Sequence, residues 1–267
     1  MKKILLLSLL SISVFSQTSN IFEPIDVFDL EYVSNTEISS DGDKVLYQRN
    51  FNDIMTDESF SNIWLIDYDG TNNRPITTGN FKDNSPKWSN NGDKFIFKSN
   101  REGKSQIYLF DLNNNSIQKL TNFQYSIEST QWSPNDKYIL FSSFIDSDRD
   151  TLIEMPEKPK GAKWNDPPIE ISDLNYRYDS SGFRKPGEVQ FFTIPINGGT
   201  PRQISNIKPE KRAGQAEWLG NDKIIFSANF NDDSDYNTNN SEIYILSLES
   251  GKHEALTSRD GPDSSPK

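Results

Sequence analysis

Arrangements of residues that would activate a nucleophile are scarce in this 267-residue chain. The sequence contains one histidine, His253, no cysteine, and no G-x-S-x-G motif, the turn that exposes the nucleophile of α/β-hydrolases. A catalytic histidine needs a nucleophile and an orienting acid around it, whereas His253 lies between Lys252 and Glu254 in a β-like run. We therefore expect a solvated strand or turn histidine, and we assign no catalytic residue and no cofactor-binding residue.

The acidic run at residues 146–157 is the segment that most resembles a metal site. It places carboxylates at positions 1, 3, 5, 9 and 12 of an EF-hand-like loop. Position 6, where glycine is expected, is Thr151, Pro156 stiffens the exit, and no flanking helices are predicted. Calcium binding is therefore a hypothesis, with a solvated acidic loop as the alternative, and the run at 231–235 is a weaker case. With one histidine and no cysteine a zinc site is excluded, so we assign no metal ligand and no cofactor.

Cationic side chains in a long loop are the better candidates for contact with a ligand. Residues 142–188 are charged, rich in proline and poor in strand signal, and long loops inside compact domains are usually functional or disordered. The candidates for contact with a peptide are Arg149, Lys158, Lys160, Arg177 and Arg184.

A repeated pattern must position this loop. Each of four copies starts with Trp or Ile, continues through Asn, Asp or Gly residues that suit a hairpin turn, and enters a β-rich run. An aromatic residue in a second buried-strand pattern follows, and then a short closing segment. The three columns are Ile38, Trp88, Trp132 and Trp218; Trp64, Tyr108, Phe192 and Tyr244; and residues 75–77, 119–121, 203–205 and 255–257. Each unit is therefore expected to contain four strands.

The spacing of the units predicts a β-propeller. Trp88 and Trp132 are 44 residues apart, the period of a four-stranded blade. Trp132 and Trp218 are 86 residues apart with only one aromatic-column strand between them, so the surplus is an insertion within one blade. A two-sheet sandwich is the alternative, but it gives no reason for the recurring pattern. Tryptophans at the blade period indicate packing between blades rather than a ligand-stacking surface.

We predict an all-β fold: a partial β-propeller of four four-stranded antiparallel blades, with a long insertion in the third blade. The expected segments are a signal peptide at 1–16, a lead-in at 17–36 and the propeller at 37–267. The blades are expected at about 37–84, 85–128, 129–214 and 215–264, and the insertion at 142–188.

Composition and the first residues predict an exported protein. The positive start, short apolar core and small residue of positions 1–16 are typical of a secretory signal peptide, and the run is too short to span a bilayer. The net charge of −11 repels nucleic-acid phosphates and anionic membranes, so we expect neither partner and no membrane span. We expect a periplasmic or extracellular location, without disulfides because cysteine is absent.

The opening segment resembles the start of a known family. Residues 25–33, 38–42, 53–57 and 62–64, together with 175–179 and 197–203, are similar to the N-terminal β-propeller of secreted prolyl oligopeptidase family serine peptidases, closest to the acylaminoacyl-peptidase-like branch. The resemblance covers nearly all of residues 22–267. It implies a C-terminal α/β-hydrolase domain with a Ser-Asp-His triad and oligopeptide substrates that enter between the two domains. Residues 260–267 run parallel to 83–87, just before Trp88, so the chain is expected to be truncated before that domain.

Two functions from different classes are consistent with the sequence. The first is the substrate-gating propeller of an exported serine peptidase that hydrolyses oligopeptides. The second is a non-enzymatic, exported TolB-like propeller that acts as a protein-interaction platform. The opening segment and the third-blade insertion favour the first.

Overall fold

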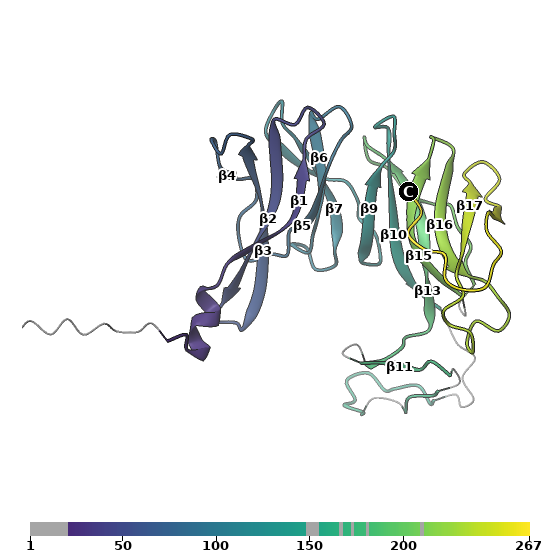
Figure 1. Cartoon of the computed structure of the whole chain (residues 1–267). Helices are drawn as coiled ribbons and strands as arrows, with labels where there is room; N and C mark the ends of the chain where they lie inside the picture. Colours follow the sequence, from purple (N-terminus) through teal and green to yellow (C-terminus); the bar gives the residue numbers. More distant parts are fainter. Residues whose placement is uncertain (1–20, 148–154, 166–167, 172–173, 180–181, 209–210) are drawn as a thin grey trace, which may run out of the picture.

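The chain forms four antiparallel four-stranded sheets that lie side by side in an arc (Figure 1). The computed structural model describes residues 21–147, 155–165, 168–171, 174–179, 182–208 and 211–267. Within these residues the one helix is a 3-10 helix, η1 (Pro24–Asp29). The predicted fold class, a partial β-propeller of four blades, is confirmed, while the domain limits remain a proposal.

Strand order within each sheet follows the chain, as expected for a propeller blade. The first two sheets contain β1 (Tyr32–Ile38), β2 (Lys44–Asp53), β3 (Glu58–Asp67) and β4 (Arg74–Pro75); and β5 (Asn84–Trp88), β6 (Lys94–Ser99), β7 (Gln106–Asp111) and β8 (Ser116–Lys119). The third contains β9 (Ile127–Trp132), β10 (Tyr138–Asp146), β13 (Gly187–Pro195) and β14 (Arg202–Gln203), and the fourth β15 (Arg212–Leu219), β16 (Lys223–Asn229), β17 (Glu242–Ser247) and β18 (His253–Ala255).

The insertion starts and ends next to one residue pair of the third sheet, Asp146 and Gly187. β10 and β13 pair without interruption from Tyr138 opposite Pro195 to Asp146 opposite Gly187. The excursion therefore occupies residues 147–186, because the two strands continue past the predicted start at residue 142. It carries a separate short hairpin of β11 (Arg177–Tyr178) and β12 (Gly182–Phe183).

Apolar packing between neighbouring sheets forms the core. Each of three buried clusters joins two adjacent sheets, as when Leu46 of β2 packs with Phe95 of β6. Ile96 and Ile139 belong to the cluster between the second and third sheets, and Phe191 to the one between the third and fourth. The prediction that the repeated aromatic residues pack between blades is supported by this arrangement, because each cluster needs two sheets to close it.

In the second and third sheets, the tryptophan that ends the first strand also binds the preceding sheet by a hydrogen bond. The indole N–H of Trp88 donates to the Glu37 carbonyl at 3.1 Å, and that of Trp132 donates to the Lys87 carbonyl at 2.9 Å. The indole N–H of Trp218 has no partner among the residues that the structure describes. At that joint the Trp218 backbone N–H donates to the Gln131 side chain instead, at 2.9 Å.

The last strand of each sheet is shorter than the sequence predicts. We expected strands over residues 75–77, 119–121, 203–205 and 255–257, but each of these strands ends at the first residue of its segment. The reason is a hydroxyl group two residues later, which accepts the next hydrogen bond from the third strand in place of a backbone carbonyl. The four acceptors are Thr77, Thr121, Ser205 and Thr257, and their N–H donors are Ile63, Ile107, Phe191 and Ile243, at 2.8 to 2.9 Å.

A buried ion pair lies between the first two sheets. Asp83 is fully buried, and both of its carboxylate oxygens accept from the Arg101 guanidinium at 2.9 Å. The guanidinium carbon also lies 4.7 Å from the centre of the Tyr108 ring. A buried carboxylate of this kind depends on its partner for compensation of its charge.

We expect Thr121→Val to lower the free energy of unfolding by about 1–3 kcal/mol, because it leaves the buried Ile107 N–H without its acceptor. The measurement is chemical denaturation of the purified chain. Thr56→Val is the matched control, because Thr56 is exposed and its hydroxyl has no recorded hydrogen bond in the described part of the chain. Equal losses in the two variants would contradict the assigned role of the hydroxyl.

We expect Asp83→Asn to cost about 3 kcal/mol, because it removes the charge of a fully buried carboxylate and leaves the partly buried Arg101 without its ion-pair partner. Glu31→Gln is the control: it breaks the Arg49–Glu31 pair, in which both side chains are partly exposed, and should cost less than about 1 kcal/mol. The same denaturation experiment compares them, and a loss at Asp83 no larger than that at Glu31 would refute the prediction.

Candidate functional site

The insertion hairpin projects beyond the sheets at the end where β2 meets β3 and where β10 meets β13 (Figure 1). η1 lies at this same end (Figure 1). We call this end of the sheets the loop face. The opposite end carries the short Trp-turn hairpins.

Aromatic and basic side chains gather on the insertion hairpin. The rings of Tyr176 and Phe183 stack with their centres 6.3 Å apart, and both are exposed. The Arg184 backbone N–H donates to the Tyr176 carbonyl at 2.8 Å, and the Arg184 side chain donates to the Asn175 carbonyl at 3.3 Å. Arg184 is thus held against the hairpin, next to two exposed aromatic rings.

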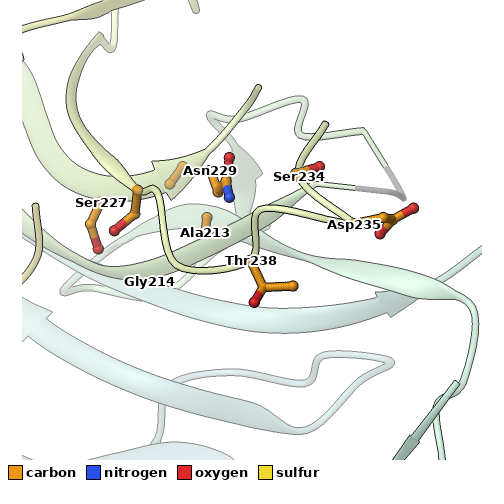
Figure 2. Close-up of a pocket in the computed structure, with 9 residues that line it drawn as sticks. Ala213, Gly214, Ser227, Asn229, Ser234, Asp235 and Thr238 are labelled. Atoms are coloured by element: carbon orange, nitrogen blue, oxygen red, sulfur yellow. The ribbon is translucent and has the colours of Figure 1, made fainter. Parts of the chain in front are cut away.

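The hairpin contacts the fourth sheet beside a pocket. The Asn175 side chain donates to the Asp235 carbonyl at 3.2 Å, in the loop that joins β16 to β17. The pocket has a volume of about 250 Å³ and lies between this loop and the first two strands of the sheet (Figure 2). Its lining consists of small and polar residues, among them Ala213, Gly214, Ser227, Asn229, Asp235 and Thr238.

A β-bulge shapes the inner end of the pocket. The register of β15 against β16 shifts between Ala213 and Ala216. A Cβ atom on Gly214 would lie 2.5 Å from the Ser227 hydroxyl oxygen, so no larger residue fits at that position without moving Ser227. The backbone and the Ser227 hydroxyl can approach each other closely because Gly214 has no side chain.

Comparison with the second sheet explains why Ala213 leaves space. Trp218 pairs with Ile224 as Trp88 pairs with Phe95. Counting from these pairs, Ala213 occupies the position of Asp83, and Phe230 occupies that of Arg101. The fourth sheet therefore lacks the buried ion pair: Ala213 lines the pocket, and the Phe230 ring packs 4.6 Å from that of Tyr244.

The pocket offers hydroxyl groups to a polar ligand. Among the described residues, the hydroxyls of Ser227 and Thr238 have no recorded hydrogen bond, so they are available to a ligand. Asp235 is exposed at the opposite end of the pocket from Ser227 (Figure 2). His253, in β18, packs 4.9 Å from the Phe230 ring in contacts typical of a surface aromatic cluster. Hydroxyls without a neighbouring base can bind polar groups but are weak nucleophiles.

The structure brings together only some of the residues singled out in the sequence. Arg177 and Arg184 share the insertion hairpin, while Lys158 and Lys160 lie exposed in an irregular stretch ahead of it. Arg149 and most of the acidic run, residues 148–154, lie outside the described residues, as does the proposed signal peptide. In the part of the chain that is described, no cluster of three possible metal ligands is found, and no helix is long and apolar enough to cross a bilayer.

Gly214 and Ser227 were missed by the sequence reasoning. No repeat signal marks them, because Asp and Arg occupy the equivalent positions in the second unit alone, whereas the third unit has Ile127 and Ile145 there. The run at 231–235 was noted only as acidic, but its last two residues, Ser234 and Asp235, line the pocket.

Comparison with known proteins places the chain among propellers. Residues 39–158 match the family model described as TolB beta propeller domain. The uncharacterized peptidase YuxL of Bacillus subtilis is 25% identical over 226 residues, covering 83% of this chain and 33% of that protein. The chain thus spans about a third of the length of the curated relative that it matches.

Solved structures give the same fold. The uncomplexed acylaminoacyl peptidase of Pyrococcus horikoshii has a TM-score of 0.64 at 18% identity, covering 87% of this chain and 33% of that one. TolB from Acinetobacter baumannii has a TM-score of 0.50 at 16% identity, covering 87% and 45%. The TolB beta propeller model thus matches residues 39–158, and the resemblance of the chain to the propellers of peptidases is confirmed.

We expect calcium to have no effect on this chain, because the run at 146–157 lacks the glycine and the flanking helices of an EF-hand loop. The measurement is calorimetric titration with calcium, together with thermal unfolding with and without the ion. A saturable heat that disappears in Asp148→Asn but persists in the matched variant Asp232→Asn would establish a calcium site at 146–157 and contradict this expectation.

Proposed function

We propose that this chain is the substrate-gating propeller of an exported serine peptidase that hydrolyses oligopeptides. The observation that carries the proposal is the match to peptidases over 83% to 87% of this chain but only a third of theirs. The catalytic groups would then reside in an α/β-hydrolase domain outside the residues given, where acyl transfer takes place. The chain itself contributes binding and exclusion.

The loop face is the part of the propeller that would meet the peptide. The insertion presents the exposed rings of Tyr176 and Phe183 beside Arg184. Aromatic rings bury a large area at little entropic cost, and a guanidinium binds peptide carbonyls and carboxylates. The adjoining pocket adds two available hydroxyls, from Ser227 and Thr238. Together these groups suit an extended polar chain better than a folded protein surface.

A protein-interaction platform of the TolB-like kind is the second candidate. The description of the matching family model favours it, and the TolB structure shares the fold. The two proposals separate on the whole gene product. A peptidase requires a G-x-S-x-G serine and a late histidine in the surrounding coding sequence, whereas a platform requires neither.

We expect the full-length protein to react with a fluorophosphonate probe. It should cleave short peptides but not a folded protein that contains the same peptide sequences. Tyr176→Ala should raise KM for a short peptide about three- to tenfold, through loss of one aromatic contact. Tyr138→Ala is the matched control, because the two tyrosines are similarly exposed, at 46% and 43%, but Tyr138 starts β10 at the opposite end of the sheet. Absence of probe labelling would refute the peptidase and favour the platform.

A further inference from the structure

A second pocket lies on the loop face of the first sheet, between η1 and the β2–β3 hairpin. Its volume is about 470 Å³. The walls include Phe28 and Asp29 from η1, and Phe51, Asp53 and Ile54 from the hairpin. Its walls therefore come mainly from two elements, η1 and the β2–β3 hairpin.

The pocket forms because the first hairpin is longer than that of the second sheet. β2 and β3 have ten residues each, against six each for β6 and β7 at the same place in the second sheet. The additional rungs carry Phe51 and Asp53 beyond the sheet core to meet η1. The Asn52 side chain fixes the contact by donating to the Val27 carbonyl of η1 at 2.8 Å.

The charge of the pocket is negative. Asp29 and Asp53 contribute two carboxylates, and no Lys, Arg or His is among the lining residues. Asp53 accepts from the Met55 N–H at 2.9 Å and from the Asn80 side chain at 3.2 Å, so its position is fixed. Asp29 is exposed, and its carboxylate has no recorded hydrogen bond in the described residues, which leaves it available to a ligand.

Arg49 lies against the Phe51 ring but is paired with a carboxylate outside the lining of the pocket. The Arg49 guanidinium carbon lies 5.6 Å from the centre of the Phe51 ring, but Arg49 forms an ion pair with Glu31. The Phe51 ring is also held by the Phe60 ring, with centres 5.9 Å apart. One face of the pocket is therefore a fixed aromatic ring next to uncompensated acidic groups.

Two carboxylates beside aromatic walls are suited to a cation with an apolar stem. A guanidinium can stack on a ring and donate two parallel hydrogen bonds to a carboxylate, whereas an ammonium donates as a point charge. The Ile25 and Ile54 side chains offer apolar surface to an aliphatic stem. We propose that this pocket binds the arginine side chain of a peptide. The inference goes beyond the proposed peptidase function and does not depend on catalysis, because it concerns equilibrium binding to this chain alone.

The test is binding of three blocked tripeptides to the purified chain, measured by NMR titration. Alanine flanks a central arginine, lysine or citrulline, the last being the neutral counterpart of arginine. We expect arginine to bind about tenfold more tightly than citrulline and about threefold more tightly than lysine, from one charge-assisted bond and one cation–π contact. Equal binding of arginine and citrulline would overturn the proposal, and equal binding of arginine and lysine would overturn the assignment to arginine.

Substitution of single carboxylates tests whether the arginine peptide binds in this pocket. Asp29→Asn should weaken binding of the arginine peptide about three- to tenfold and leave citrulline binding unchanged. The matched control is Asp57→Asn, an exposed turn residue of the same hairpin with a φ of 54°, which asparagine adopts readily. Identical binding by the two variants would refute the pocket. Amide shifts confined to η1 and the hairpin should accompany binding, and circular dichroism verifies that both variants keep the fold.

Discussion

The second and third sheets of this chain are apolar on both faces, and the rest of the structure depends on this constraint. In β6, Phe95 and Phe97 face the first sheet while Ile96 faces the third, and all three are fully buried. A sheet with two apolar faces is stable in water only if both are covered. The sheets therefore stack, and stacking brings their first strands into contact while the loops stay at the two ends. The loop face and its pockets are consequences of this arrangement.

Hydrogen bonds add contacts of defined geometry to the apolar packing, which by itself has no preferred direction. The indole N–H bonds of Trp88 and Trp132 tie the second and the third sheet to the sheet before each of them. A second set works within the Trp-turn hairpins, where a buried serine donates to the Asn or Asp two residues on and accepts from the backbone five residues on. The three serines are Ser39, Ser89 and Ser133. The fourth unit has Leu219 in that place and also lacks the indole bond, so the two departures from the pattern occur in the same unit.

Much of the architecture could be predicted because the signals recur. A single Trp-turn pattern is consistent with many folds. Four copies of it in one chain are consistent with few folds. The shape of the insertion could not be predicted, since its strands are two residues long and its hairpin depends on the stacking of Tyr176 on Phe183. The pocket of the fourth sheet was hidden for another reason. It arises because the small residue Ala213 stands where the second sheet has Asp83, and this correspondence is visible only once the register is known.

The end of each sheet's last strand is closed by a side-chain hydroxyl, and this has a consequence for how the domain can change. Thr121 and its counterparts fix the final rung between the third and fourth strands, and this rung is the same whatever the length of the loop between the second and third strands. The β6–β7 turn is short, whereas β10 and β13 are joined by the long excursion, yet both sheets end in the same way. The loops of this face can therefore differ in length and sequence while the last rung of each sheet stays the same.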